Sequence, residues 1–130
     1  MPTTPNITPI LVYADIEAAL SFLVEAFGFE PGPLHRSDDG QVVHGEVYAN
    51  GGPIWLHRET PEHDLSSPRS HQLAFGGLAI LVEDVDTHYE RARAAGAMIE
   101  QMPQDQPYGR REYGVRDREG HRWWFGTEVE

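Results

Sequence analysis

Two hydrophobic periods alternate along the chain, and they follow one another in the same order in both halves. The segment 7–29, ITPILVYADIEAALSFLVEAFGF, has a short apolar run and then apolar residues at helical spacing, namely Ile16, Ala19, Leu20, Leu23 and Phe27. The segment 76–98, GGLAILVEDVDTHYERARAAGAM, repeats this order with a weaker helical set, namely Val85, His88, Tyr89 and Ala92. Each half is therefore predicted to begin with a strand that leads into a helix.

The ends of both predicted helices carry capping residues. Asp15 and Asp84 precede the helical sets, and an Asp at that position accepts a hydrogen bond from a free amide of the first turn. Gly28 and Gly96 follow the helical sets, and glycine adopts the left-handed conformation that ends a helix without steric cost. These residues predict where both helices start and stop.

Beyond each helix the hydrophobic period changes to two, which is typical of strands. In the first half, the turns SDDG (37–40) and NGG (50–52) separate PLHR (33–36), QVVHGEVYA (41–49) and PIWLHRE (53–59). In the second half the runs are MIEQM (98–102), REYGVR (111–116) and HRWWFG (121–126), with DREG (117–120) as a tight turn. Aligning Asp15 with Asp84 gives an internal repeat of roughly 65 to 70 residues.

This repeat predicts an α+β fold of two tandem modules, each made of a strand, a helix and three further strands. We expect a single domain over residues 1–130, with module 1 at about 5–59, a linker at 60–72 and module 2 at about 73–128. The linker, TPEHDLSSPRSHQ, is rich in Pro, Ser and charged residues, so it is predicted to be a loop.

Composition narrows the classes of partner. The chain has 21 acidic residues, ten arginines, no lysine and a net charge of −11, which repels polyphosphates, so we expect no nucleic-acid partner. Five arginines gather in GRREYGVRDREGHRWWF (109–125), but Glu112, Asp117 and Glu119 interrupt them. The sequence has no apolar run of bilayer length and no basic leader, so we expect no membrane partner and a cytoplasmic location. It has no cysteine, which excludes disulfides and thiolate chemistry.

The terminal segment PYGRREYGVRDREGHRWWF (107–125) resembles a known family ending, P-aromatic-G-x-R-E…R-D-P-x-G-H-x-W-x-F. That ending is typical of the bleomycin-resistance-like branch of the vicinal oxygen chelate superfamily, which also includes glyoxalase I and extradiol dioxygenases. The segment 7–29 resembles the start of the same branch, whereas Arg118 departs from it by standing where the family usually has Pro. The resemblance covers nearly the whole chain. It implies paired modules with curved mixed sheets around a cleft, and dimers whose clefts use both chains.

Metal-dependent members of this superfamily hold a divalent ion with four ligands, two from each module. The resemblance places these positions at Thr8, Trp55, Gly77 and Trp124. Gly and Trp offer no coordinating side-chain atom and a Thr hydroxyl is a weak ligand, so we expect no metal and no other cofactor. His44 and Glu46, two apart on one strand, leave an adventitious site with His57 open as an alternative to a polar cavity wall.

Strand alternation assigns the aromatic residues to faces. If position 124 faces the cleft, Trp124 and Arg122 line it, and Trp123 and Phe125 pack beneath a helix. The same rule in module 1 places Ile54 and Leu56 in the core. It predicts that the following residues line the cleft: Pro53, Trp55, His57, His44, Glu46 and Tyr48.

The resemblance adds two residues near the terminal hairpin. It implies an aromatic contact from Tyr108, and Arg111 matches an arginine that either orders the hairpin or reaches an anionic ligand group. The predicted ligand-binding residues are thus Trp55, Trp124, Tyr108, His44, Glu46, His57, Arg111, Arg122 and Tyr48. We expect Arg110, Arg116 and Arg118 to be solvated edge charges that pair with the abundant carboxylates and contribute little stability each. His121 is expected to pack against or cap the hairpin, whereas His35, His63, His71 and His88 are not distinguished from surface residues.

The leading functional hypothesis is a non-enzymatic, homodimeric protein that binds a small molecule. Two indoles at ligand positions would stack on a planar aromatic or cationic compound, and the resemblance suggests sequestration of the kind that confers antibiotic resistance. The alternative is a metal-dependent lyase, isomerase or dioxygenase of the glyoxalase type. A third class, a structural or regulatory dimer with a vestigial cleft, also fits the sequence.

Overall fold

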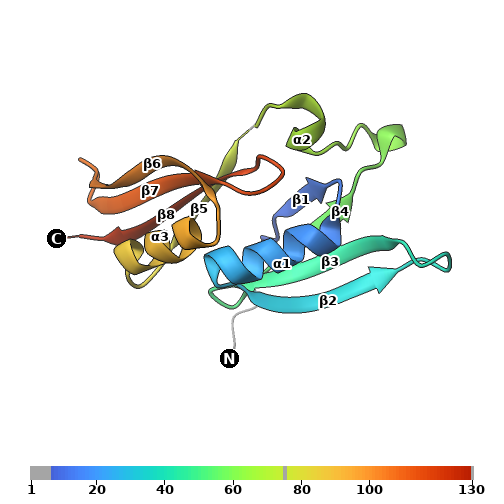
Figure 1. Ribbon diagram of the computed structural model, residues 1–130, viewed down its shortest axis with the longest axis horizontal. Coiled ribbons are helices and arrows are strands. Elements are labelled where there is room, and N and C mark those ends of the chain that lie inside the picture. Colours follow the sequence, from blue (N-terminus) through green and yellow to red (C-terminus); the bar gives the residue numbers. More distant parts are fainter. Residues whose placement is uncertain (1–6, 75, 130) are drawn as a thin grey trace.

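The computed structural model describes residues 7–74 and 76–129. Positions 5 and 6 of the expected first module, and position 75 of the second, lie outside the described residues. The chain is α+β, and two βαβββ modules form two four-stranded mixed sheets. Sheet 1 has the order β1-β4-β3-β2 and sheet 2 the order β5-β8-β7-β6 (Figure 1).

Module 1 contains the first five main elements of the chain. They are β1 (Ile10–Tyr13), α1 (Ile16–Phe27), β2 (Glu30–Arg36), β3 (Val42–Ala49) and β4 (Gly52–Arg58). In module 2 they are β5 (Gly77–Leu81), α3 (Val85–Ala94), β6 (Met98–Asp105), β7 (Arg110–Arg116) and β8 (Arg122–Glu128). In each module the first strand pairs in parallel with the last strand, and the other pairs are antiparallel.

The predicted caps define the helices. The Asp15 carboxylate accepts from the amide of Ala18 at 3.0 Å, and Asp84 does the same for Thr87 at 3.2 Å. Gly28 ends α1 with φ 75°, as expected. Helix α3 ends at Ala94, and Gly96 occupies the predicted C′ position with φ 86°, where the Ala97 amide donates to the Ala92 carbonyl.

The two modules share one core, formed where the helix-facing sides of both sheets meet. The ring of Phe27, at the end of α1, lies 5.5 Å from that of Trp123 and 4.8 Å from that of Phe125, both on β8. Phe29 adds a contact of 5.5 Å to Trp123. Helices α1 and α3 pack side by side across the middle of the molecule (Figure 1). The opposite faces of the sheets therefore point away from this core.

The predicted loop 60–72 is partly helical. It contains a short 3-10 turn, η1 (Pro61–His63), and a single-turn helix, α2 (Pro68–His71). Glu59 anchors it, because its carboxylate accepts from the Ser66 hydroxyl at 3.1 Å and the Ser67 amide at 2.8 Å. These hydrogen bonds, which no local pattern in the sequence predicts, tie the segment to the end of β4.

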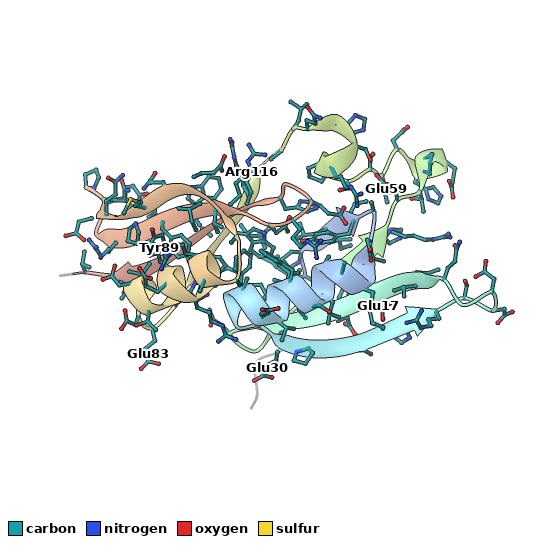
Figure 2. All side chains as sticks on the ribbon, viewed as in Figure 1. Glu17, Glu30, Glu59, Glu83, Tyr89 and Arg116 are labelled. Carbon is teal, nitrogen blue, oxygen red and sulfur yellow. The ribbon has the colours of Figure 1, made fainter. Side chains whose placement is uncertain are left out.

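Several acidic side chains lie on the outer surface, as Glu17, Glu30 and Glu83 show in Figure 2. Within the described parts of the chain, no helix is long and apolar enough to cross a membrane.

Candidate functional site

We call the side of sheet 1 that points away from the shared core face 1, and the corresponding side of sheet 2 face 2. Opposed residues of an antiparallel pair lie on the same side of a sheet. His44 opposes His57, Glu46 opposes Trp55, and Tyr48 opposes Pro53. All the predicted cleft residues of module 1 therefore lie on face 1. Ile54 and Leu56 point to the core, where they are 3% and 0% exposed, as predicted.

Trp55 stands near the middle of face 1, with its side chain 40% exposed. The imidazole of His44 packs edge-on against its indole, with 5.7 Å between ring centroids. Tyr48 leans over β2, because a Cβ at Gly32 would lie 3.0 Å from the ring of Tyr48 and from the Cβ of Glu46. Face 1 thus presents an accessible indole beside a carboxylate, with imidazoles nearby.

On face 2 the indole of Trp124 spreads over both neighbouring strands. A Cβ at Gly77 on β5 would lie 2.7 Å from Trp124 Cζ3, and one at Gly114 on β7 would lie 3.4 Å from Trp124 Nε1. These atoms are at opposite ends of the indole, so the ring lies across the sheet between two glycines. Larger residues at either side would cover or tilt it. The arrangement gives face 2 a broad aromatic floor.

Beside this floor, Arg122 forms an ion pair with Glu100, and so does Arg116. The distances to the Glu100 carboxylate are 3.1 Å from Arg122 Nε and 2.8 Å from Arg116 Nε, and Figure 2 labels Arg116 on this part of the molecule. Partial burial opposes ionisation of Glu100, but the two guanidinium groups outweigh it and lower the pKa of that carboxyl. Arg116 pairs with a carboxylate, as expected, but its side chain is only 20% exposed, so the expectation that it is solvated was wrong.

Tyr108 lies at the turn before β7 and is 63% exposed. Its hydroxyl donates to the carboxylate of Glu112, a residue of face 2 that is only 8% exposed. This hydrogen bond raises the pKa of Tyr108, with a smaller contribution from desolvation. The structure therefore brings Tyr108 to the rim of the same face as Trp124.

Arg111 differs from the other predicted residues because it lies on the opposite side of β7. It opposes Thr127, one residue out of phase with face 2. Its guanidinium binds Asp86 of α3 at 3.1 Å and Asp105 of β6 at 3.2 Å. Of its two expected roles, ordering the hairpin matches these contacts. The side chain points away from the two indoles.

Arg110, expected to be solvated, is the residue of face 2 that the sequence reasoning missed. Its side chain is 24% exposed and its Nε lies 3.6 Å from the Glu112 carboxylate. Strand alternation could have identified it, because Arg110 and Glu112 lie on the same side of β7 as Gly114, which is the strand neighbour of Trp124. A basic run of this kind is also typical of surface charge, and Arg118 is exposed as that predicts.

The positions of the family's metal ligands do not fit a metal in this chain. Gly77 and Trp124 meet on face 2 without any coordinating side-chain atom, and Trp55 supplies none on face 1. Among the described residues, no group of three or more His, Cys, Asp or Glu is placed to hold a metal ion. His44, Glu46 and His57 share a face but do not form such a group.

Two histidines join elements of different modules. His121 Nε2 donates to the backbone oxygen of Val12 at 2.8 Å and its ring packs on Tyr13, so it is a packing residue, but its partners lie in module 1 and not in its own hairpin. His88 corrects a prediction, because it is not a surface residue. It contacts the Phe27 carbonyl at 2.8 Å and the Tyr113 hydroxyl at 2.7 Å.

The tautomer of neutral His88 follows from these partners. A carbonyl only accepts, so Nε2 carries the proton and Nδ1 accepts from the hydroxyl of Tyr113. Burial lowers the pKa of His88, and the nearby Arg91 charge lowers it further, against the hydrogen bond to Phe27. Burial also raises the pKa of Tyr113. Both groups are therefore held neutral at the junction of the modules.

The terminal turn 117–120 is docked on module 1 by buried carboxylates. Asp117 accepts from the Tyr13 hydroxyl at 2.5 Å and from Trp123 Nε1 at 3.1 Å. Glu119 accepts from the amides of Ala14 and Asp15 at 2.6 and 2.8 Å. Burial, followed by the charge of Asp117, raises the pKa of Tyr13 well above its usual value. These contacts explain the acidic residues in the basic stretch, because they fasten the hairpin that carries Trp124.

Comparisons with known proteins agree with this fold. The family profile described as the Glyoxalase/Bleomycin resistance protein/Dioxygenase superfamily matches residues 6–125. The uncharacterized protein Mb0911c of Mycobacterium bovis is 32% identical over 134 residues, covering 96% of this chain and 84% of that protein.

Among solved structures, TioX from Micromonospora sp. ML1 is 33% identical with a TM-score of 0.76, covering 96% of this chain and 99% of TioX. A member of the glyoxalase/bleomycin resistance protein/dioxygenase superfamily from Sphaerobacter thermophilus DSM 20745 has a TM-score of 0.69 at 20% identity. The match covers 98% of both chains, and at that identity it shows the fold alone.

Proposed function

Because the chain belongs to the glyoxalase/bleomycin resistance protein/dioxygenase superfamily, we propose that it is a small-molecule-binding protein whose ligand stacks on Trp55 and Trp124. The observation that carries the proposal is the indole of Trp124, spread between Gly77 and Gly114 where a metal-dependent relative would have a ligand. Stacking on such a ring contributes about 0.5–1.5 kcal/mol beyond the area buried. A sequestering protein needs affinity for its ligand but no catalytic chemistry.

The charge of face 1 adds a preference. Glu46 stands directly opposite Trp55 on the neighbouring strand, so a cationic group on the ligand would find a carboxylate beside the indole. A desolvated cation over an aromatic ring gains up to about 2 kcal/mol. We therefore propose planar aromatic compounds, including cationic ones, as the ligand class, antibiotics being one source, and the cytoplasm as the place of sequestration.

The binding site would be completed by a second copy of the chain. Face 1 and face 2 both point away from the shared core, so each indole is available to be covered by a face of a second chain. In the proposed homodimer, face 1 of one protomer lies opposite face 2 of its partner, and the ligand lies between two indoles. Exposed apolar side chains on these faces, including Ile10 at 55% and Leu81 at 42%, would be covered in such a dimer.

The first test is a binding screen by isothermal titration calorimetry with planar probes of different charge. Phenazine-1-carboxamide, phenazine-1-carboxylate and 9-aminoacridine supply neutral, anionic and cationic rings of similar size. We expect saturable binding of at least one probe. Trp124→Ala and Trp55→Ala should each weaken it by about 5- to 150-fold, as expected for the loss of about 1–3 kcal/mol of stacking. Arg111→Gln is the matched control, because this side chain points to the other face. Normal binding by both Trp variants would refute the proposal.

The second test asks whether the site spans two chains. Trp55→Ala and Trp124→Ala proteins are unfolded together, refolded as a mixture and titrated with the probe that binds best. If each site combines face 1 and face 2 from different protomers, every heterodimer contains one site with both indoles intact. Mixing should therefore restore a fraction of high-affinity sites. If sedimentation shows a dimer but mixing restores none, the site lies within one chain.

A further inference from the structure

The guanidinium group of Arg110 lies on face 2 with two donors that no described residue satisfies. Its Nε and Nη2 atoms are buried, and neither has a hydrogen-bond partner among the described residues. The group lies over Gly126, where a Cβ would be 2.9 Å from Nη2 and 3.0 Å from Nε. Buried donors are nearly always paired in folded proteins, so an unpaired pair on a charged group requires an explanation.

The nearest carboxylate does not supply the missing acceptor. Glu112 Oε2 is 3.6 Å from Arg110 Nε, too far for a hydrogen bond, and Glu112 Oε1 accepts from Tyr108. The neighbouring arginines Arg116 and Arg122 both place their Nε atoms against Glu100. Among the described residues of face 2, Arg110 is the arginine with two buried donors that lack an acceptor.

The two unpaired atoms are suited to one kind of acceptor. The N–H bonds of Nε and Nη2 run parallel along one edge of the guanidinium plane, and a carboxylate accepts both at once. A single carbonyl oxygen could satisfy only one of them well. The geometry of the donors thus selects a two-oxygen anion.

Space for a ligand lies beside the side chain of Arg110. Arg110 lines a cavity of about 440 Å³ at the seam between the sheets, together with Pro53, Ala79 and Leu81. Ala79 is the strand neighbour of Trp124, and Leu81 is that of Gly126. A planar ring on the indole therefore extends towards the guanidinium over apolar walls, where weak solvation strengthens a charge-assisted hydrogen bond.

We propose that Arg110 is a specificity-determining residue that binds a carboxylate of the aromatic ligand through Nε and Nη2. This inference rests on the proposed function, since it places the ring of the ligand on Trp124. It refines that function, because it predicts that the protein prefers an aromatic acid over its neutral amide although the chain as a whole is strongly acidic.

The test compares phenazine-1-carboxylate with phenazine-1-carboxamide by calorimetry, with wild type, Arg110→Gln and Arg110→Lys. Loss of charge-assisted hydrogen bonds corresponds to a fall of about 10- to 100-fold. We expect wild type to prefer the carboxylate by at least about tenfold, Arg110→Gln to lose this preference, and Arg110→Lys to retain part of it. Amide binding should change little. Arg116→Gln is the matched control, because it removes an arginine of the same strand and face that is already paired.

The outcomes separate the two proposals. If Trp124→Ala abolishes binding but wild type does not distinguish acid from amide, or if Arg110→Gln keeps the preference, the assignment of Arg110 is wrong and the stacking site stands. If Arg110→Gln weakens acid and amide equally, Arg110 shapes the face as a partner of Glu112, and the inference is again refuted. If no probe binds wild type, both proposals fail together.

Discussion

Replacing each of the two glycines that flank Trp124 by alanine is expected to change the free energy of unfolding in opposite directions. At Gly77, an added Cβ would lie 2.5 Å from the backbone oxygen of Arg122 and 2.7 Å from Trp124 Cζ3. At Gly114, the nearest atoms would be Trp124 Nε1 at 3.4 Å and Trp124 Cδ1 at 3.5 Å, which is ordinary contact. Neither glycine has a positive φ, so alanine fits the backbone conformation at both sites.

The magnitudes follow from these distances. Gly77→Ala requires β5 and β8 to separate or the indole to move, and overpacking of this kind costs about 1–3 kcal/mol. Restriction of the unfolded chain by alanine returns about 0.4–1 kcal/mol. We expect a net loss of about 1–2 kcal/mol for Gly77→Ala. For Gly114→Ala only the second effect applies, so a gain of up to about 1 kcal/mol is expected.

Thermal unfolding followed by circular dichroism measures both changes. For a chain of this size about 1 kcal/mol corresponds to roughly 3–6 °C in Tm, so the two variants should move Tm in opposite directions. Calorimetry with the best phenazine or acridine probe should show weaker binding for Gly77→Ala and near-normal binding for Gly114→Ala. Equal behaviour of the two variants, or unchanged binding by a destabilised Gly77→Ala, would show that the indole does not lie between these glycines.

Three further predictions concern the contacts of charged and titratable side chains. Burial lowers the pKa of His88 in the folded protein. The stability that neutral His88 contributes is therefore fully present above the pKa of the unfolded chain, about 6.5. It is lost as the pH falls below that pKa and through the lower pKa of the folded state. His88→Gln, which keeps a donor and an acceptor, should therefore flatten the Tm curve below about pH 7, and an unchanged slope would contradict this. Asp117→Asn should lower the unfolding free energy by about 3–5 kcal/mol in urea titrations, because every partner of that carboxylate is a donor. Tyr13→Phe, which removes one of these donors, should cost less than Asp117→Asn, and the reverse order would refute the argument. Arg111→Gln breaks exposed ion pairs and should change stability by at most about 1 kcal/mol, whereas a larger loss would show that it does more than order the hairpin.

The local part of this structure is readable from the chain itself. Asp15, Asp84 and Gly28 mark helix ends because capping is a contact between residues close in sequence. Strand alternation alone predicts that Trp123 and Trp124 point to opposite sides of the sheet, and the structure confirms this, with Trp123 fully buried in the core. The sequence therefore determined the two modules and which indole would lie on the open face.

What only the tertiary structure decided involves partners far apart in sequence. Tyr13 and Asp117 are 104 residues apart, and His88 reaches Phe27 across 61. No local pattern distinguishes such residues from solvated ones. The two unpaired donors of Arg110 could not be predicted either, because they depend on which carboxylates Arg116, Arg122 and Tyr108 bind. Periodicity fixes the side of a strand on which a residue lies, but only packing fixes whether a charged group finds its partner.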